Sequence, residues 1–202
     1  MKQLKIGVII IGIVLMLFFL KIATNKDDQN LGSGYYFLPN YEAIDVGYPY
    51  GNLIYKSNNK NYFDIILIRS DIKNVNYNDQ FIIVYQEPNK KLALKEISNM
   101  LILWNNYYNE IKRDSLINLE YEKVSLSDIN KMIGGKNSEQ ITRITDSIFS
   151  SEESYKKVFA NKYNYYIIDK VNNTISEPLS LKEFNKKKKE KNIDLEFVEL
   201  SD

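Results

Sequence analysis

The 202-residue chain contains neither cysteine nor histidine. Without cysteine it forms no disulfide, offers no thiolate nucleophile and has no thiolate ligand for zinc. Without histidine it lacks the side chain that most often transfers protons near neutral pH, which also excludes a Ser–His–Asp triad. Carboxylates, hydroxyls and amines are left as sources of chemistry, and we expect neither a metal ion nor another cofactor.

An excess of one charge is also missing. The chain has 27 basic and 26 acidic residues, and setting aside Lys2, Lys5 and Lys21, which flank the first apolar run, leaves 24 basic against 26 acidic residues. Proteins that bind nucleic acid through its phosphates need a basic surface, so this balance predicts no nucleic-acid partner. A hydrophobic fraction of 44% and a charged fraction of 26% are typical of a globular protein.

A run of 15 uncharged residues, 6–20, lies near the start of the chain. Extended past Lys21 to Thr24, it nearly reaches the length of about 20 residues that a transmembrane helix needs. We interpret residues 1–24 as an uncleaved signal anchor whose residues 6–24 cross the membrane. Two alternatives remain: a cleaved signal peptide, for which only Ala23 resembles a cleavage site, and a buried core helix.

The lysines before this run predict the topology. Lys2 and Lys5 give the short leading tail a positive charge, and positively charged flanks stay in the cytoplasm. We therefore expect a single-pass protein of the bacterial cytoplasmic membrane with its N-terminus inside. Residues 25–34 are then a polar linker, and 35–202 form an extracytoplasmic domain, which is secreted if the segment is cleaved.

The rest of the chain predicts an α+β fold. Runs of β-branched and aromatic residues separated by short polar turns predict antiparallel strands over 35–38, 52–57, 62–69, 71–77, 80–86, 163–169 and 195–200. Asn172-Asn173 is typical of a hairpin turn and pairs the strand before it with a short strand at 174–176. We expect a mainly antiparallel sheet of about five to seven strands with packed helices.

Helices are predicted between and after these strands. Apolar residues spaced by three and four over about 90–112 favour a first helix. Residues that can cap a helix favour three more helices before residue 160. The capping residues are Ser125, Asn137 and Ser150. Residues 90–160 thus read as a helical insertion, and Ser180 with Glu183 forms a capping box for a last helix.

The segments GYYFLPNYEAI, YPYGNLIYKS, FIIVYQEPN and YYIIDKVNNTISEPLSLKEF together resemble an uncharacterised family of small bacterial proteins of the Bacteroidota type. The resemblance covers about residues 34–88 and 161–198. It implies an N-terminal export or anchor segment and supports the expected fold. It implies no activity, because that family has none assigned.

Two stretches are candidates for a binding surface. Tyr36 and Tyr55 lie in strand-like runs, so we expect their burial, whereas Tyr48 and Tyr50 flank Pro49 in a turn where exposed rings could contact a partner. The run of lysines from Lys186 to Lys189 is either a solvated helix face or a contact for anionic lipid headgroups or an acidic protein. The lysines of this run are Lys186, Lys187, Lys188 and Lys189.

No carboxylates show a spacing that is typical of catalysis. The candidates lie in or beside predicted strands and turns: Glu42, Asp45, Asp64, Asp71, Asp79 and Asp169. We therefore expect a membrane-anchored, extracytoplasmic, non-enzymatic binding or structural domain whose ligand or protein partner the sequence does not identify. The alternatives are an immunity-like inhibitor that binds a toxin or an envelope enzyme and a hydrolase that uses carboxylates.

Overall fold

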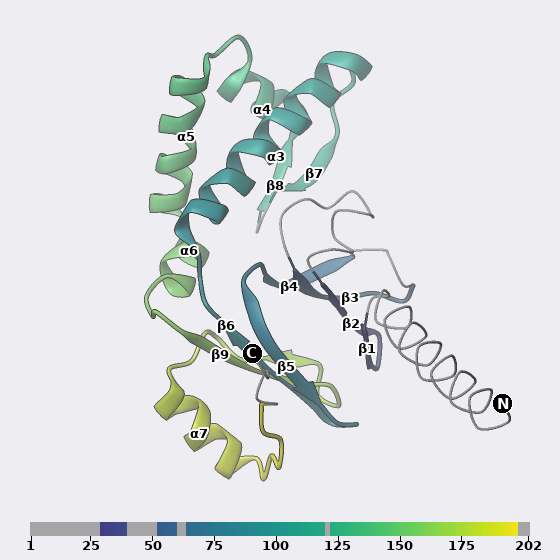
Figure 1. Cartoon of the computed structure of the whole chain (residues 1–202). Helices are drawn as coiled ribbons and strands as arrows, with labels where there is room; N and C mark the ends of the chain where they lie inside the picture. Colours follow the sequence, from purple (N-terminus) through teal and green to yellow (C-terminus); the bar gives the residue numbers. More distant parts are fainter. Residues whose placement is uncertain (1–28, 40–51, 60–63, 120–121, 198–202) are drawn as a thin grey trace, which may run out of the picture. The chain divides into compact units, whose positions relative to one another are not determined.

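The computed structural model describes residues 29–39, 52–59, 64–119 and 122–197, which form an α+β arrangement of antiparallel sheets and helices (Figure 1). The chain divides into two compact units, one up to residue 67 and the other from residue 68 onward. We describe each unit by itself. The predicted membrane segment, Tyr48 and Tyr50 lie outside the described residues. Within the described residues, no helix has both the length and the apolar character needed to cross a membrane.

The first unit is built on a four-stranded sheet of order β1-β2-β3-β4. Its strands are β1 (Gln29–Gly32), β2 (Tyr35–Leu38), β3 (Leu53–Lys56) and β4 (Ile65–Arg69), the last of which crosses the boundary between the units. β1 pairs antiparallel with β2, and β2 pairs antiparallel with β3. β1 and the turn after it occupy residues that we assigned to the linker. The prediction of a linker is therefore wrong for residues 29–34, which form a strand and a turn.

The two tyrosines that we expected in this sheet differ in burial. Tyr55 is completely buried and packs in a cluster with Leu38 and Leu53, which confirms the prediction for this residue. Tyr36 is only half-buried and stacks on Tyr55 with 5.1 Å between ring centroids. Truncation of a fully buried aromatic ring typically costs about 3–5 kcal/mol, so Tyr55 is a core residue of the first unit.

The second unit contains another antiparallel sheet, of order β10-β9-β6-β5. Its strands are β5 (Ile72–Tyr77), β6 (Phe81–Gln86), β9 (Asn164–Asp169) and β10 (Thr174–Ile175), followed by helix α7 (Leu181–Glu190). Ile83 and Ile167 on one face pack against Phe184 of α7 and against Ile193 and Leu195, which follow it. The prediction of one sheet with five to seven strands is thus wrong, because the strands divide between separate sheets.

The segment between β6 and β9 is mainly helical. It consists of α3 (Lys90–Ile111), β7 (Leu116–Leu119), β8 (Glu122–Ser125), α4 (Leu126–Ile133), α5 (Ser138–Ser151) and α6 (Glu153–Val158). The antiparallel hairpin of β7 and β8 was not predicted, because its alternating pattern extends over only a few residues. The predicted helices are confirmed on either side of it.

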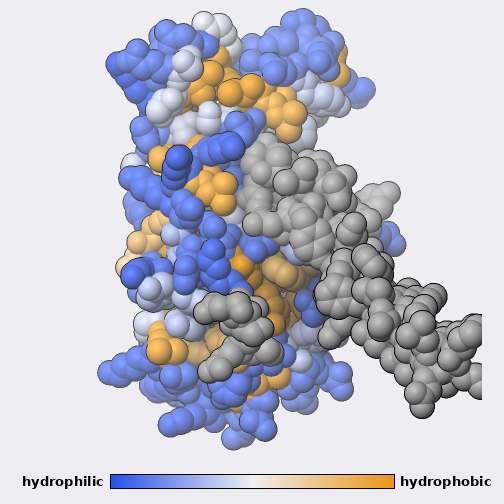
Figure 2. All heavy atoms as spheres, viewed as in Figure 1, coloured by the Kyte–Doolittle hydropathy of each residue, from blue (hydrophilic) through white to orange (hydrophobic). Residues whose placement is uncertain are grey.

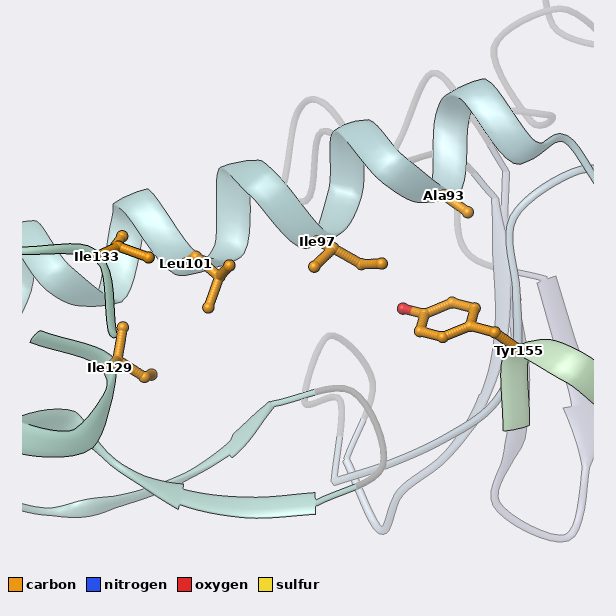
Figure 3. Close-up of a cluster of buried hydrophobic side chains, with 6 residues drawn as sticks. All are labelled: Ala93, Ile97, Leu101, Ile129, Ile133 and Tyr155. Atoms are coloured by element: carbon orange, nitrogen blue, oxygen red, sulfur yellow. The ribbon is translucent and has the colours of Figure 1, made fainter. Parts of the chain in front are cut away.

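The helical segment has its own core. Ala93, Ile97 and Leu101 project from one side of α3 toward two isoleucines of α4 and toward Tyr155 of α6, whose hydroxyl end points to the α3 side chains (Figure 3). These positions repeat every four residues, which is the spacing that places side chains on one helix face. The helical spacing of these apolar residues in the sequence therefore accounts for their meeting in one cluster.

Most of the predicted helix caps are present. The side chains of Ser125, Asn137 and Ser180 each accept a hydrogen bond from a backbone N–H in the first turn of their helix, and the last two form complete capping boxes. Ser150 is not a cap, because its hydroxyl donates to the Asp146 carbonyl within α5. The predicted strand at 195–200 is also absent from its described part, where residues 195–197 pack on the sheet without a regular structure.

A buried glutamine joins the two ends of the helical segment. Gln86, at the end of β6, is 4% exposed, and its amide donates to the carbonyls of Arg69 and Ser70 at 2.7 and 3.1 Å. Its Oε1 accepts from the Tyr166 hydroxyl at 2.9 Å and from Nδ2 of Asn164 at 3.1 Å, although Asn164 lies 78 positions away. The amide oxygen and the amide NH2 group of one side chain thus hold β6, β9 and the turn before β5 together.

We expect the substitution Gln86→Leu to lower the free energy of unfolding by about 3 kcal/mol or more. Leucine fills a similar volume but removes a hydrogen-bond partner from the buried side chains of Asn164 and Tyr166 and from two backbone carbonyls, and a buried polar group that loses its hydrogen bond costs about 1–3 kcal/mol. Chemical denaturation of the full chain measures the change. Gln80→Leu, at an exposed position of the β5–β6 hairpin, is the matched control and should alter stability by less than about 0.5 kcal/mol. Equal effects of the two substitutions would contradict the role of the Gln86 amide.

Candidate functional site

A row of aromatic rings lies on the face of the second sheet that α7 covers. Tyr85 of β6 and Tyr165 of β9 stand opposite each other in the strand pairing, and their rings stack with centroids 5.2 Å apart and planes 22° apart. Because side chains of a strand alternate between faces, Tyr85 shares its face with Ile83 and Phe81. The pairing register of β6 and β9 therefore creates the stack.

Phe184 and Phe197 close one end of this row. The ring of Phe184 stacks on Tyr165 at 5.2 Å and on Phe197 at 5.7 Å, and Phe197 also lies 6.2 Å from Tyr85. Phe184 is buried, so this end belongs to the core of the second unit. The position of each tyrosine is consequently fixed by packing rather than by a flexible loop.

Tyr163 forms the other end, which is open to solvent. It lies just before β9, is 39% exposed, and its ring is 6.0 Å from that of Tyr85 with 51° between the planes. The ammonium of Lys162 lies 4.8 Å from the Tyr163 centroid. We call Tyr85, Tyr163 and Tyr165 the tyrosine cluster. Its rings meet at an angle at the open end and in parallel at the closed end.

Polar groups surround the open end of the tyrosine cluster. The Tyr85 hydroxyl donates a hydrogen bond of 2.5 Å to Oε1 of Glu87. Burial, and then this hydrogen bond, raise the pKa of Tyr85 above its usual range, so the phenol remains a neutral donor. The hydrogen bond between Lys162 and Tyr163 raises the pKa of Lys162, to which Glu87 adds a smaller effect of the same sign. The edge of the cluster therefore carries one carboxylate and one ammonium.

A second carboxylate lies near Glu87. Asp71 is half-buried, its carbonyl accepts from the Glu87 backbone N–H at 3.0 Å, and burial raises the pKa of its side chain. Lys73 opposes this shift and Glu87 adds to it. Among the residues that the structure describes, no three acidic side chains converge as metal ligands would. This edge therefore carries two carboxylates, of Asp71 and Glu87, and two ammonium groups, of Lys73 and Lys162.

The lysines that the sequence singled out lie on α7, and they do not share one environment. Lys188 is 8% exposed, and its ammonium donates to the Leu195 carbonyl and, at 2.7 Å, to the Glu196 carboxylate. Lys186 is exposed and pairs with Glu190 at 3.7 Å. Lys187 is half-buried and Lys189 is exposed. The run is therefore partly structural, because Lys188 holds the segment after α7 against the helix.

The C-terminal end of α7 borders an open depression. Its volume is about 540 Å³, and its lining residues are mostly polar: Asn185, Lys188, Lys189, Asn192, Ile193, Asp194 and Glu196. Figure 2 shows that the face viewed is mostly hydrophilic where α7 lies in Figure 1, with smaller hydrophobic groups above it. Because basic and acidic side chains both line this depression, its charge is mixed.

The tyrosine cluster was not predicted as a site. The sequence drew attention to Tyr48 and Tyr50, where aromatic residues are dense, and the structure brings together three tyrosines from two distant segments instead. Alternation within β6 and β9 predicts that Tyr85 and Tyr165 each lie on one face of a strand, but their adjacency depends on a pairing across the whole helical segment. No local signal contains that information.

Asp169, the carboxylate that we expected beside the hairpin turn, is the last residue of β9, directly before that turn. Its carboxylate accepts from the backbone N–H and the side-chain amide of Asn172, each at 3.0 Å, and pairs with Lys191 at 3.2 Å. The bonds to Asn172 are the main reason why the pKa of Asp169 lies below its usual value, and Lys191 adds to the shift. The side chain is 6% exposed. This carboxylate stabilises the β9–β10 hairpin.

No protein-family model, no curated protein and no solved structure matches the chain. The resemblance seen in the sequence therefore stays a prediction, and function has to be argued from the residues themselves.

We expect Asp169→Asn to lower the free energy of unfolding by about 1 kcal/mol at neutral pH, because the charge that Asn172 and Lys191 stabilise is lost. A carboxylate whose pKa is lower in the folded state stabilises the protein above the pKa of the unfolded state. That contribution disappears as the pH falls through the folded value. The difference between wild type and variant should therefore be constant near neutrality and shrink below about pH 4.

Denaturation curves from pH 7 down to pH 3 test this pH dependence. Asp146→Asn, on the exposed surface of α5, is the control and should change stability by less than about 0.5 kcal/mol. A difference for Asp169→Asn that stays constant to the lowest pH would show that the charge is not what stabilises the hairpin.

Proposed function

We propose that this chain is a membrane-anchored, extracytoplasmic binding domain without catalytic turnover, and that it holds its ligand at the tyrosine cluster. The observation that carries the proposal is the set of three tyrosines. Core residues pack against one end of the set, and Tyr163 at the other end is exposed to solvent. Tyrosine is enriched in binding sites because one rigid ring offers apolar area and a hydroxyl together.

The way in which the tyrosine cluster is supported favours binding over simple packing. Tyr85 and Tyr165 rise from adjacent, fully paired strands, so a ligand does not have to order them. Binding surfaces that are ordered in advance lose less conformational entropy when the ligand arrives. Glu87 and Lys162 add hydrogen-bonding groups of both charges at the edge. Apolar rings with a few directed polar groups are what small-ligand sites generally contain.

The anchor in this proposal is the N-terminal segment of residues 6–24, with Lys2 and Lys5 on the cytoplasmic side. A domain on a short tether remains close to the lipid surface, and α7 could then bring basic side chains to anionic headgroups. Lys189 is exposed, whereas Lys188 is engaged within the second unit by its ion pair with Glu196. Lipid contact by α7 would be secondary to ligand binding at the tyrosine cluster.

An immunity-like inhibitor is the second candidate function. Clustered tyrosines also form the centre of many protein–protein interfaces, where a few aromatic side chains contribute most of the binding free energy. The partial exposure of Tyr163 beside Lys162 and Glu87 is the observation that fits this reading. Such an inhibitor would need a much larger interface, of about 800 Å² on each partner.

The proposed topology predicts the behaviour of a reporter fused after Asp202. We expect alkaline phosphatase at this position to be active and a cytoplasmic reporter such as β-galactosidase to be inactive, because the positive tail stays inside. Replacing both Lys2 and Lys5 by glutamate should reduce phosphatase activity. Activity of the cytoplasmic reporter alone would contradict the topology, and release of soluble mature protein would show cleavage.

The proposed binding site predicts that Tyr163→Ala weakens the binding of at least one small probe about tenfold or more without changing the melting temperature. Tyr163 is partly exposed, so its truncation removes contact area for a ligand and little core. Saturation-transfer NMR on the full chain in phosphatidylglycerol nanodiscs is the measurement. The probes are N-acetylglucosamine, choline and N-acetylprolinamide.

Tyr107→Ala is the matched control, because Tyr107 is 44% exposed on α3 and belongs to a different part of the second unit. It should leave the binding of every probe unchanged. If no probe binds the wild type at millimolar concentration, or if both variants bind all probes as the wild type does, the tyrosine cluster is a packing feature and the proposal fails.

A further inference from the structure

We propose that the ligand of the tyrosine cluster is an organic cation with a quaternary ammonium group, which lies against Tyr163 and Tyr85 with Glu87 as its counter-charge. This inference rests on the proposed function, since it names the class of ligand for the same site. Its starting point is Lys162, whose ammonium lies over the Tyr163 ring at 4.8 Å. That distance is within the range of about 6 Å over which an aromatic face attracts a cation.

Lys162 therefore occupies the place that a ligand cation would take. Lys162 lies in the bend between α6 and β9, outside any helix or strand, and its side chain is exposed. A primary ammonium is small and strongly hydrated, so water competes well for it. A quaternary ammonium is larger and more weakly hydrated, and aromatic residues bind such groups in many proteins. A ligand of this kind can displace Lys162 toward solvent.

The angle between the rings favours a rounded cation over a flat ligand. Tyr163 and Tyr85 meet at 51°, which forms a corner with two aromatic faces. A flat sugar ring or nucleobase needs one free, extended face, and one face of Tyr85 is already covered by Tyr165, which is stacked on it at 5.2 Å. A trimethylammonium group presents methyl groups in several directions and can contact both rings of the corner.

Charge at the site agrees with this choice. Glu87 accepts a hydrogen bond from the Tyr85 hydroxyl and is near enough to Lys162 to raise the pKa of its ammonium, so its carboxylate lies within electrostatic reach of both residues. Asp71 adds a second acidic group near Glu87, and Lys73 lies beside Asp71. Once Lys162 has moved away, the two carboxylates of Glu87 and Asp71 outnumber the one ammonium of Lys73, so a cation gains from the charge at this edge.

The test compares choline with its neutral isostere 3,3-dimethylbutan-1-ol, in which carbon replaces the ammonium nitrogen. Both are titrated by NMR into the full chain in phosphatidylglycerol nanodiscs, with sodium chloride at equal concentration as the control for ionic strength. We expect choline to bind at least about tenfold more tightly, because the two molecules share their shape and differ in charge. Equal binding of both would overturn the inference.

Three substitutions make the test specific. Glu87→Gln keeps an acceptor for Tyr85 and should weaken choline binding about tenfold, while Lys162→Gln removes the internal competitor and should strengthen it severalfold. Lys182→Gln, on exposed α7 surface, is the matched control and should change nothing. If Glu87→Gln and Lys162→Gln both bind choline as the wild type does, choline binds elsewhere and the inference fails.

The inference and the proposed function can fail separately. If N-acetylglucosamine or N-acetylprolinamide binds in a manner that depends on Tyr163 and choline does not bind, the tyrosine cluster is a site but its ligand is not a cation. If no probe depends on Tyr163, both proposals fall together.

Discussion

The antiparallel pairing of β6 with β9 is the constraint on which the second unit depends. The chain closes a long loop to form it, and loop closure is unfavourable in entropy until contacts on both sides of the loop are made. Gln86 supplies such contacts at the point of closure, since its side chain bonds to Asn164 and Tyr166 on β9 and to carbonyls before β5. A buried polar network of this kind is stabilising only when all its members have partners. It therefore selects one register, in which Gln86 faces Asn164.

That register places the aromatic residues. A slip of one residue in a strand pair would move every side chain to the opposite face, so Tyr85 and Tyr165 stack only in the pairing that Gln86 specifies. Phe184 on α7 and Phe197 after it then cover one end of the stack, and Lys188 holds the segment that carries Phe197 by bonding to its backbone and to Glu196. The open end at Tyr163 is thus the part of the row that core packing does not use.

Local patterns in the sequence predicted most of the individual elements. The 3.6-residue period of α3, the caps at Ser125 and Asn137 and the Ser180–Glu183 box all act over a single turn of helix, so a short window contains their whole cause. Ser150 fails as a cap because α5 continues past it, which depends on how Ile148 and Phe149 pack in the helical core. The number of sheets was beyond prediction for a related reason. Strand pairing is decided between segments, and the β7–β8 hairpin has too few residues to display its alternation.

The lysines show why composition does not locate a charged site. A chain with nearly equal numbers of basic and acidic residues gives no general attraction for ions, yet each side chain acts over only about 8–10 Å at physiological salt. Four consecutive lysines on α7 suggested one basic surface, but a helix distributes neighbouring residues around its axis, so Lys188 points into the unit while Lys186 and Lys189 face solvent. Lys162, by contrast, has no other lysine beside it; its ammonium lies over the ring of the adjacent Tyr163, and the start of β9 next to β6 brings it within electrostatic reach of Glu87. What a charged residue does in this protein is therefore set by its neighbours in space, and the pairing of β6 with β9 decides which neighbours those are.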